Sequence, residues 1–366
     1  MVSGRRGVVR GWTDELPGGH DGRNPKEAVL MKAMLTTAHG DRSVLKLDDN
    51  FADPVAGAGE AVVEVKATAV NYHDLFTRRG MPGIRIGFPL IVGSDIAGVV
   101  QTVGDGADES WIGKRVLIDP VFRDGKRFGM IGETCHGGRA ELVAVATGQL
   151  LELPEGVSLE QAAALPLAYG TAWRMMVTQG QVKAGESVLV LGASGGVGVG
   201  CVSIAKLFGA EVVACASSAA KIERLKALGA DHVVNYAETN FREAVWEIKG
   251  KPRISGEGGV DMAINFTGGD TMIDTQRSVA LGGRILTCGA TAGYDLDIDA
   301  RYWWTFEQHM IGANGWTPDD LCQLLTRIDA GEIDPVIDVV LPLEEASEAE
   351  RLLEDREVFG KVLLRP

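Results

Sequence analysis

One segment near the middle of the chain constrains the fold more than any other. The apolar run Ser187–Leu191 is followed by a glycine-rich turn over residues 192–198, a helical stretch to Leu207, and a second apolar run, Glu211–Ala216. A buried strand, a tight turn, a helix and a second strand in this order are typical of a doubly wound α/β sheet. Similar alternation continues to about Cys288, so we predict a parallel sheet with helices on its faces.

The turn contains a variant of the dinucleotide-binding fingerprint G-x-G-x-x-G. Its six residues are Ala193, Ser194, Gly195, Gly196, Val197 and Gly198. Gly195 allows the backbone to approach a pyrophosphate, Gly198 lets the helix pack close to the strand, and Ala193 still permits the turn. The helix N-terminus then faces the phosphates. A glycine-rich turn without a ligand is the alternative, but the complete strand–turn–helix–strand context favours a dinucleotide.

The end of the second apolar run indicates which dinucleotide binds. Enzymes that use NAD usually place an Asp or Glu there to bind the ribose 2′-OH, but no acid lies between Glu211 and Glu223. The residues present are Ser217, Ser218 and Lys221, and hydroxyls with an ammonium suit a 2′-phosphate. We therefore predict NADP(H). In the alternative interpretation the serines cap the next helix and the lysine is solvated.

Composition excludes several functional classes. The 366-residue chain has a formal net charge of −14, which argues against a nucleic-acid partner. Its five cysteines are widely spaced, and no apolar run reaches the length of a membrane span, so we predict a reduced, cytoplasmic protein that binds no membrane. Residues 1–31 are rich in glycine and charge and are predicted to form a flexible extension.

Several motifs together resemble those of the medium-chain dehydrogenase/reductase superfamily over residues 32–366. The matching segments include Val70–Asp74, Gly93–Gly98, Gly113–Val116, Gly137–Glu141, Tyr169–Ala172, the glycine turn and Gly360–Val362. The resemblance implies a GroES-like, β-rich catalytic domain formed by residues 32–155 and 317–366. It also implies a Rossmann domain over residues 156–316 that binds NADP(H), a small-molecule hydride acceptor, and assembly as a homodimer or homotetramer.

Zinc-dependent members of that superfamily hold a catalytic metal at places that fall on Asn71, on Ser94 with Asp95, and near Ala163 in this chain. Zinc prefers thiolate, imidazole and carboxylate ligands, usually three from the protein in a catalytic site. Asparagine, serine and alanine are not such ligands, and Asp95 alone cannot hold the ion. We therefore predict no catalytic metal.

The structural-zinc lobe of those members would lie between Ile118 and Gly137, where Cys135 is the one cysteine. Cys135 and His136 could form half a site, but an ordinary pair of loop residues is the simpler interpretation. We predict no structural metal either, and the resemblance narrows to the zinc-free quinone oxidoreductases and enoyl reductases.

The resemblance to the zinc-free branch assigns further cofactor positions. In that branch a Lys and a Tyr fifteen residues later flank the 2′-phosphate, which is the spacing of Lys221 and Tyr236 (236 − 221 = 15). Thr171 matches a position beside the nicotinamide. Phe266 and the pair Cys288 and Gly289 follow apolar runs, and ligands bind at the carboxyl ends of strands in such sheets.

Without a Lewis acid, an activated C=C bond is easier to reduce than a simple ketone, because hydrogen-bond donors can stabilise the charge on the conjugated oxygen. The predicted function is therefore that of a zinc-independent, NADPH-dependent oxidoreductase transferring hydride to a quinone or an α,β-unsaturated carbonyl or enoyl acceptor. Two alternatives stay open: an alcohol dehydrogenase-type carbonyl reductase with an unusual metal site, and a non-catalytic NADPH-binding protein.

The sequence offers more than one candidate for the donor that stabilises the charge on the acceptor's oxygen. Many zinc-free relatives have a Tyr five residues after the Asn of the first motif, where this chain has Phe76. Asn71, Tyr72 and His73 are the candidate catalytic residues; the alternatives are an aromatic that lines the cleft and a surface or capping histidine. The predicted substrate pocket also includes three aromatic residues, although a dimer interface uses aromatics equally well. These are Phe76, Trp304 and Trp316.

Overall fold

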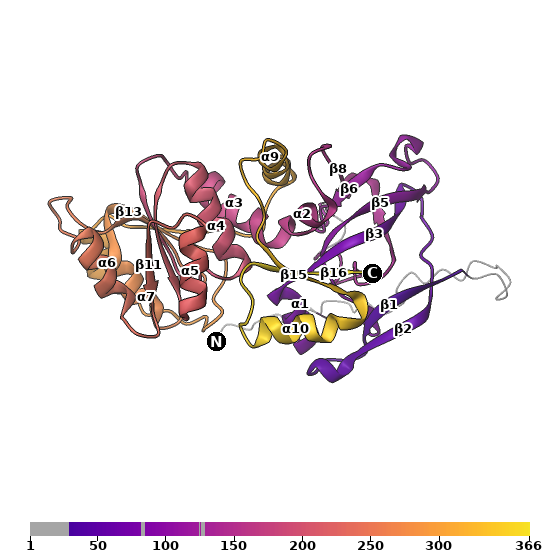
Figure 1. The fold of residues 1–366 in the computed structure, drawn as a ribbon, viewed down its shortest axis with the longest axis horizontal. Coiled ribbons are helices and arrows are strands. Elements are labelled where there is room, and N and C mark those ends of the chain that lie inside the picture. Colours follow the sequence, from indigo (N-terminus) through magenta and orange to yellow (C-terminus); the bar gives the residue numbers. More distant parts are fainter. Residues whose placement is uncertain (1–28, 82–84, 124, 126–128) are drawn as a thin grey trace, which may run out of the picture.

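The computed structural model describes residues 29–81, 85–123, 125 and 129–366. They form two parts that lie side by side, a β-rich part and an α/β part (Figure 1). The predicted fold class is confirmed. The predicted flexible extension lies outside the described residues except for residues 29–31, and the first strand already begins at Leu30.

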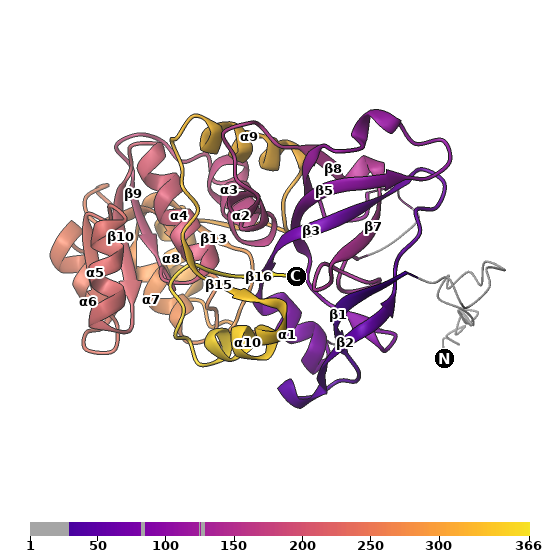
Figure 2. The same ribbon diagram turned by 45° about the vertical axis from the view of Figure 1, so that its right-hand side comes forward.

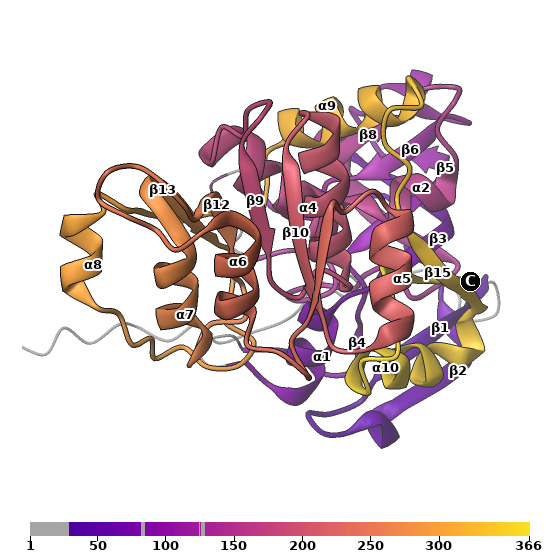
Figure 3. The same ribbon diagram turned by 60° about the vertical axis from the view of Figure 1, so that its left-hand side comes forward.

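The α/β part is built on one sheet of six parallel strands in the order β11-β10-β9-β12-β13-β14. Figure 3 shows this sheet with its helices. The strands are β9 (Ser187–Val190), β10 (Glu211–Ala216), β11 (His232–Asn235), β12 (Val260–Ile264), β13 (Val279–Thr287) and β14 (His309–Gly312). The helices are α4 (Gly196–Leu207), α5 (Ala219–Ala227), α6 (Phe241–Lys249), α7 (Thr271–Ser278) and α8 (Ala300–Thr305).

Both faces of the central strand β9 are buried, which explains its unbroken apolar sequence. Val188 and Val190 belong to a core cluster shared with α4 and α5, whereas Leu189 and Leu191 belong to a second cluster shared with α6 and α7. Successive side chains of a strand point to opposite faces. The apolar run therefore holds helices on both sides of the sheet, as predicted.

The β-rich part contains a sheet in the order β15-β16-β3-β5-β6-β8, with β7 paired to β3, and a three-stranded sheet in the order β2-β1-β4. These strands are β1 (Leu30–Thr36), β2 (Leu45–Ala52), β3 (Glu60–Val70), β4 (Leu90–Ile91), β5 (Asp95–Val103), β6 (Arg115–Ile118), β7 (Leu142–Ala146), β8 (Leu150–Glu152), β15 (Ile337–Pro342) and β16 (Lys361–Arg365). A Cβ added to Gly98 would lie 2.1 Å from the backbone oxygen of Glu64, so β3 and β5 approach too closely there for any other residue.

The two ends of the chain meet in this larger sheet, because β16 pairs antiparallel with β3 and places Val362 opposite Val70. The helices of this part are α1 (Tyr72–Arg79) and α10 (Ala346–Glu354). The predicted domain boundaries, 155/156 and 316/317, stay a prediction. The pairing of β16 with β3 is the feature that would join the two separated segments into one domain.

A helical connection leads from the β-rich part to the phosphate-loop strand β9. It consists of α2 (Leu159–Ala163), a π-helical turn η4 (Leu165–Gly170), α3 (Thr171–Trp173) and a second π-helical turn η5 (Arg174–Gln179). Ser158 begins α2 with a capping box, since its hydroxyl accepts from the N–H of Gln161 and the Gln161 side chain accepts from the N–H of Ser158. The helix α9 (Pro318–Asp329) packs against η4, between the two parts (Figure 2). Among the described residues, none of the helices is long and apolar enough to cross a membrane.

Candidate active site

The glycine turn lies between the end of β9 and the N-terminus of α4. Gly192 has a positive φ of 63°, and a Cβ added to Gly198 would lie 2.3 Å from the Gly192 oxygen, so the helix approaches the turn as closely as only glycine allows. At Gly195 an added Cβ would meet just that oxygen, at 3.7 Å, and none of the described side chains caps α4. The uncapped N–H groups and the open space beside Gly195 fit a pyrophosphate.

The last strand of the chain passes directly beside this turn. The backbone N–H of Gly360 donates to the oxygen of Ser194 at 3.0 Å, and a Cβ added to Gly196 would lie 3.0 Å from Cδ of Lys361. The Lys361 side chain therefore starts at the phosphate turn. It leads from there into the β-rich part, where its ammonium is buried.

The ammonium of Lys361 ends between Asn71 and Asp95, and we call these three residues the Lys361 group. Lys361 Nζ donates to Oδ1 of Asn71 and lies 3.2 Å from Oδ2 of Asp95. The amide of Asn71 donates to the same carboxylate oxygen at 2.9 Å, and the other oxygen accepts from the backbone N–H of Leu167, in η4, at 2.9 Å. All three residues are less than a tenth exposed.

Burial raises the pKa of Asp95, while the charge of Lys361 and the hydrogen bonds from Asn71 and Leu167 act in the opposite direction. The neighbouring Ser94 is 1% exposed, and Ala163 is fully buried in the core around η4. No group of three or more His, Cys, Asp or Glu side chains within the described ranges is arranged to hold a metal ion.

Two family models match parts of the chain that contribute residues to this site. Residues 57–155 match the alcohol dehydrogenase GroES-like domain, and residues 196–330 match the zinc-binding dehydrogenase model. Human quinone oxidoreductase is 30% identical over 342 residues, covering 92% of this chain and 98% of the human protein. This chain belongs to the medium-chain dehydrogenase/reductase superfamily.

Solved structures agree with this assignment. An NAD-dependent alcohol dehydrogenase is 36% identical, with a TM-score of 0.84, over 92% of this chain and 100% of its own. A 2-octenoyl-CoA carboxylase reductase in complex with NADP and 2-octenoyl-CoA is 28% identical, with a TM-score of 0.81, over 92% of this chain and 87% of its own. This chain is therefore a medium-chain oxidoreductase that uses a nicotinamide cofactor.

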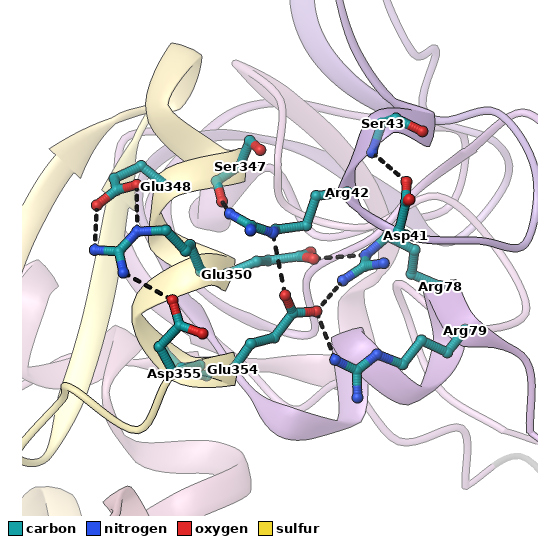
Figure 4. A network of polar contacts seen from close by, with 12 residues as sticks. Asp41, Arg42, Ser43, Arg78, Arg79, Ser347, Glu348, Glu350, Glu354 and Asp355 are labelled. Atoms are coloured by element: carbon teal, nitrogen blue, oxygen red, sulfur yellow. Dashed lines mark hydrogen bonds and ion pairs between the residues drawn. The ribbon is translucent and has the colours of Figure 1, made fainter.

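In this medium-chain enzyme, the first-motif helix α1 is held by a buried charge network. The backbone N–H of Asn71 donates to Asp74, whose carboxylate also accepts from Arg139 at 3.0 Å. Glu350 on α10 accepts from Arg139 and, at 2.6 Å, from Arg78. Figure 4 shows the part of this network that joins Arg78 to α10. The Arg139 charge holds the pKa of Glu350 below its usual value, although burial alone would raise it.

The three predicted catalytic residues lie together at the start of α1, but in different surroundings. The amide of Asn71 is engaged in the Lys361 group. The hydroxyl of Tyr72 donates to the backbone oxygen of Leu353 at 2.8 Å. His73 Nε2 lies 2.6 Å from the carboxylate of Glu133. Phe76, one turn later, contacts the Tyr72 ring with centroids 6.2 Å apart.

The predicted 2′-phosphate residues lie at the carboxyl ends of two neighbouring strands. Ser217 and Ser218 follow β10, and Tyr236 follows β11 and donates its backbone N–H to Ala216. Ser218 caps α5 by accepting from the N–H of Lys221 at 3.4 Å, so the capping alternative also holds for this serine. The exposed Ser217 and the half-exposed Tyr236 are open to a ligand.

Lys221 is joined by two arginines, and we call Lys221, Arg224 and Arg356 the Lys221 group. The Lys221 ammonium donates to the backbone oxygen of Arg356 at 2.5 Å. Burial lowers the pKa of Lys221, and the charges of Arg356 and Arg224 lower it further, against the influence of Asp338. Arg224 pairs with Asp338 at 2.6 Å. Three cations thus lie close together on a protein whose net charge is −14.

The residues predicted beside the nicotinamide occupy the strand ends on the other side of the turn. Phe266 follows β12, and its ring lies 3.1 Å from where a Cβ of Gly192 would be. Cys288 and Gly289 follow β13, and burial raises the pKa of the Cys288 thiol to about 12, so it is a neutral group at physiological pH. Thr171 begins α3 and is 9% exposed. Their contact with cofactor stays a prediction.

The two tryptophans predicted for the substrate pocket lie in different surroundings. Trp316 is 4% exposed and donates its indole N–H to Asp119 at 3.0 Å, while Arg123 binds both Asp119 and the Trp316 backbone oxygen. Trp304 is 68% exposed on α8, next to the edge strand β14. Trp304 therefore has the exposure of an interface residue, and the predicted homodimer or homotetramer stays a prediction.

Three residues that the sequence did not single out complete these clusters. Lys361 stood within a family motif, Gly360–Val362, but without a role. Glu133 lies in the segment that corresponds to the structural-zinc lobe of zinc-dependent members. Arg356 follows α10, and nothing in its local sequence points to the cofactor. A buried lysine can be suspected from a lysine inside an apolar strand sequence, as in residues 361–365, because such a side chain needs a partner.

Proposed function

We propose that this medium-chain enzyme is a zinc-independent, NADPH-dependent reductase whose hydride acceptor is a quinone or an α,β-unsaturated carbonyl or enoyl compound. One observation carries this proposal above all. The side chains at two of the places where zinc-dependent members hold their metal, Asn71 and Asp95, are bound by the ammonium of Lys361. We infer that the Lys361 ammonium supplies the positive charge that the metal supplies in zinc-dependent members.

The Lys361 group fits an ammonium better than a zinc ion. Asp95 is the one carboxylate in it, and its charge is compensated by Lys361. At a separation of about 4 Å and an effective dielectric constant of about 20, each unit of like charge costs about 4 kcal/mol, so a dication beside Lys361 would be strongly repelled. The amide of Asn71 and the methyl of Ala163 offer no anionic ligand in return.

A bound nicotinamide supplies the hydride. The protein's own residues then have three tasks: to hold the dinucleotide, to orient the acceptor, and to provide a proton. The uncapped N-terminus of α4 holds the pyrophosphate. Phe266, Cys288 and Thr171 supply neutral surroundings beside it, which suit a flat, uncharged ring. A conjugated acceptor needs no Lewis acid for this reaction, because its charge is delocalised.

The Lys221 group supports NADPH over NADH. The two arginines and the lysine provide positive charge where no acid follows β10, and Ser217 and Tyr236 add hydroxyl groups on the same side. A 2′-phosphate would compensate these cations by charge-assisted hydrogen bonds, whereas a bare 2′-OH would leave them uncompensated. The similar structures include an NAD-dependent enzyme and an NADP complex, so our inference of NADPH rests on this chain's own residues.

The test is cofactor oxidation by the purified full-length chain over a panel of quinones, enones and enoyl thioesters, with metal analysis of the same sample. We expect NADPH to be oxidised in preference to NADH, and a chelator to leave the rate unchanged. Chelator-sensitive alcohol oxidation with stoichiometric zinc would instead identify an alcohol dehydrogenase. Tight NADPH binding without turnover on any acceptor would identify a non-catalytic binding protein.

A further inference from the structure

We propose that His73 is the general acid that protonates the reduced acceptor, and that Glu133 is the positioning residue that orients its ring. This inference rests on the reductase function proposed above and deepens it. The first-motif segment offers three polar side chains at the start of α1. The contacts of each decide which of them is free to act on a substrate.

Two of the three side chains are already engaged. Asn71 accepts from Lys361 and donates to Asp95, so its amide is used within the Lys361 group. The phenol of Tyr72 donates to the backbone of Leu353, at the end of α10. Proton transfer from Tyr72 to the acceptor would need that hydrogen bond to break.

His73 differs because one of its two ring nitrogens is held and the other is not. Nε2 pairs with the Glu133 carboxylate at 2.6 Å, and Nδ1 has no hydrogen-bond partner among the described residues. The His73 side chain is 20% exposed, whereas that of Glu133 is only 4% exposed. A buried carboxylate on one nitrogen of a partly exposed imidazole is the arrangement that orients a histidine for proton transfer at the other nitrogen.

Glu133 is fixed by the turn that carries it. The backbone N–H of Glu133 donates to the oxygen of Met130, and that of Gly132 donates to Cys135. A Cβ added to Gly132 would lie 2.8 Å from the backbone of Gly93, next to Ser94 and Asp95. The turn therefore packs against the residues that precede β5, whose first residue, Asp95, belongs to the Lys361 group. This packing places the Glu133 carboxylate beside the site.

The charges around His73 favour its protonated form. Burial lowers the pKa of His73, but the hydrogen bond that His73 donates to Glu133 and the charges of Asp74, Glu133 and Asp95 outweigh it, and the net direction is upward. The nearby cations are already paired, Lys361 with Asp95 and Arg139 with Asp74. The Glu133 carboxylate is therefore the one acid facing His73 that has no other charged partner among the described residues.

The proton balance follows from this geometry. The cofactor loses a hydride to the acceptor and becomes oxidised. An enone gains a carbon–hydrogen bond and a quinone gains an oxygen–hydrogen bond, and in both the conjugated oxygen is left with a negative charge. The Nδ1–H bond of the His73 imidazolium then breaks, and its proton passes to the acceptor anion. Neutral His73 takes a proton back from solvent through its exposed edge, and its Nε2–H bond to Glu133 is kept throughout.

The experiment compares His73→Gln, Glu133→Gln and a matched control, His232→Gln, in NADPH oxidation with an enone from low to high pH. His232 also pairs with a glutamate, Glu211, at 2.9 Å, but it lies on β11, away from α1. A general acid supplies about 10²-fold or more, so His73→Gln should lower kcat by about that factor and abolish the fall of kcat at high pH. His232→Gln should change neither.

The positioning role of Glu133 has its own readout. Glu133→Gln removes the group that raises the pKa of His73, so the high-pH fall of kcat should move to lower pH. The histidine Cε1 resonance that His73→Gln deletes should titrate at correspondingly lower pH in Glu133→Gln. If His73→Gln does not fold, the shift of the kcat profile in Glu133→Gln still decides the matter.

The outcomes separate this inference from the proposed function. An active wild type whose pH profile survives in both variants overturns the role of His73 and leaves the reductase function standing. A wild type that oxidises no NADPH with any acceptor of the panel overturns both. An unchanged His73 titration in Glu133→Gln overturns the positioning role of Glu133 alone.

Discussion

Two groups of charged residues in this protein differ in the balance between their positive and negative charges. The network that joins α1 to α10 contains Asp74, Arg78, Arg139, Glu350 and Glu354, and its cations and anions alternate. The Lys221 group consists of three cations, of which Arg224 is paired with an acid, Asp338. The first group is buried and balanced, whereas the second is accessible and has excess positive charge.

We propose that charge balance, more than burial or strength of contact, distinguishes a group that binds a ligand from one that holds the fold. The network needs nothing further, since Arg78 and Arg139 already contact carboxylates. Within the described residues no ion pair is formed by Lys221 or by Arg356, on a chain with 50 acidic residues that could have provided one. The Lys361 group lies between these cases: it is buried and balanced, but it adjoins the phosphate turn.

The largest expected effect is the loss of stability when one carboxylate of the network is removed. Glu350→Gln leaves the fully buried Arg78 and Arg139 without the carboxylate between them, and breaking a buried pair in this way costs about 3–5 kcal/mol of unfolding free energy. We expect denaturant unfolding at neutral pH to show a loss in this range, while the KM for NADPH is unchanged. A lowered affinity for NADPH at unchanged stability would mean that the network belongs to the ligand-binding class.

The matched control is Glu348→Gln on the same helix. Glu348 pairs with Arg351, and both are partly exposed, so the loss should be below about 1 kcal/mol. Acid provides a second check. The pKa of Glu350 is lowered on folding, so its contribution is present above the pKa of the unfolded chain and is lost as pH falls through the folded value. Wild type and Glu350→Gln should therefore converge in stability at low pH.

A smaller loss is expected when the Lys361 group is unbalanced. Lys361→Met leaves Asp95 without its cation, but a carboxylate, unlike an arginine, can become neutral by taking up a proton. The pKa of Asp95 is already raised by burial and would rise further in the variant. We expect a loss of about 2–3 kcal/mol at neutral pH, since each unit of pKa shift is worth about 1.4 kcal/mol.

The pH dependence of that loss has a definite sign. With a folded pKa raised above that of the unfolded chain, Asp95 in Lys361→Met costs stability above the unfolded pKa, and the cost grows with pH up to the folded value. The loss relative to wild type should thus be smallest in acid. Adding Asp95→Asn should recover most of it, because the double variant has no buried charge at this place. A loss that is equal at all pH values would contradict the pairing.

The sequence predicted the phosphate turn well because its determinants are local. Ala193 to Gly198 and their flanking strands lie within a few tens of residues, and the close approach at Gly198 follows from the motif itself. The alternating strands and helices were predictable for the same reason, because β9 is apolar on both faces. The superfamily and the fold class followed from several such local motifs together.

The other clusters depend on contacts between residues far apart in the chain. Lys361 and Asp95 are separated by 266 positions, and Glu133 and His73 by 60, so neither pair is visible in any local pattern. For Trp304 and Trp316, which were predicted to share the substrate pocket, closeness in sequence does not mean shared surroundings. The two are close in sequence, but β14 lies between them, and one is exposed while the other is buried against Asp119.

The smallest effect is expected in the Lys221 group, where it should appear in binding and not in stability. Lys221→Ala removes one of three cations from a partly exposed site, so we expect the KM for NADPH to rise about 10-fold, equivalent to about 1.4 kcal/mol. The KM for NADH should stay the same, because no 2′-phosphate is present to lose a contact. Lys226→Ala is the matched control on the same helix: Lys226 is half exposed and pairs with Glu223. An equal rise in KM for both cofactors would show that Lys221 acts on the fold of α5, and the excess of positive charge would then carry no information about the ligand.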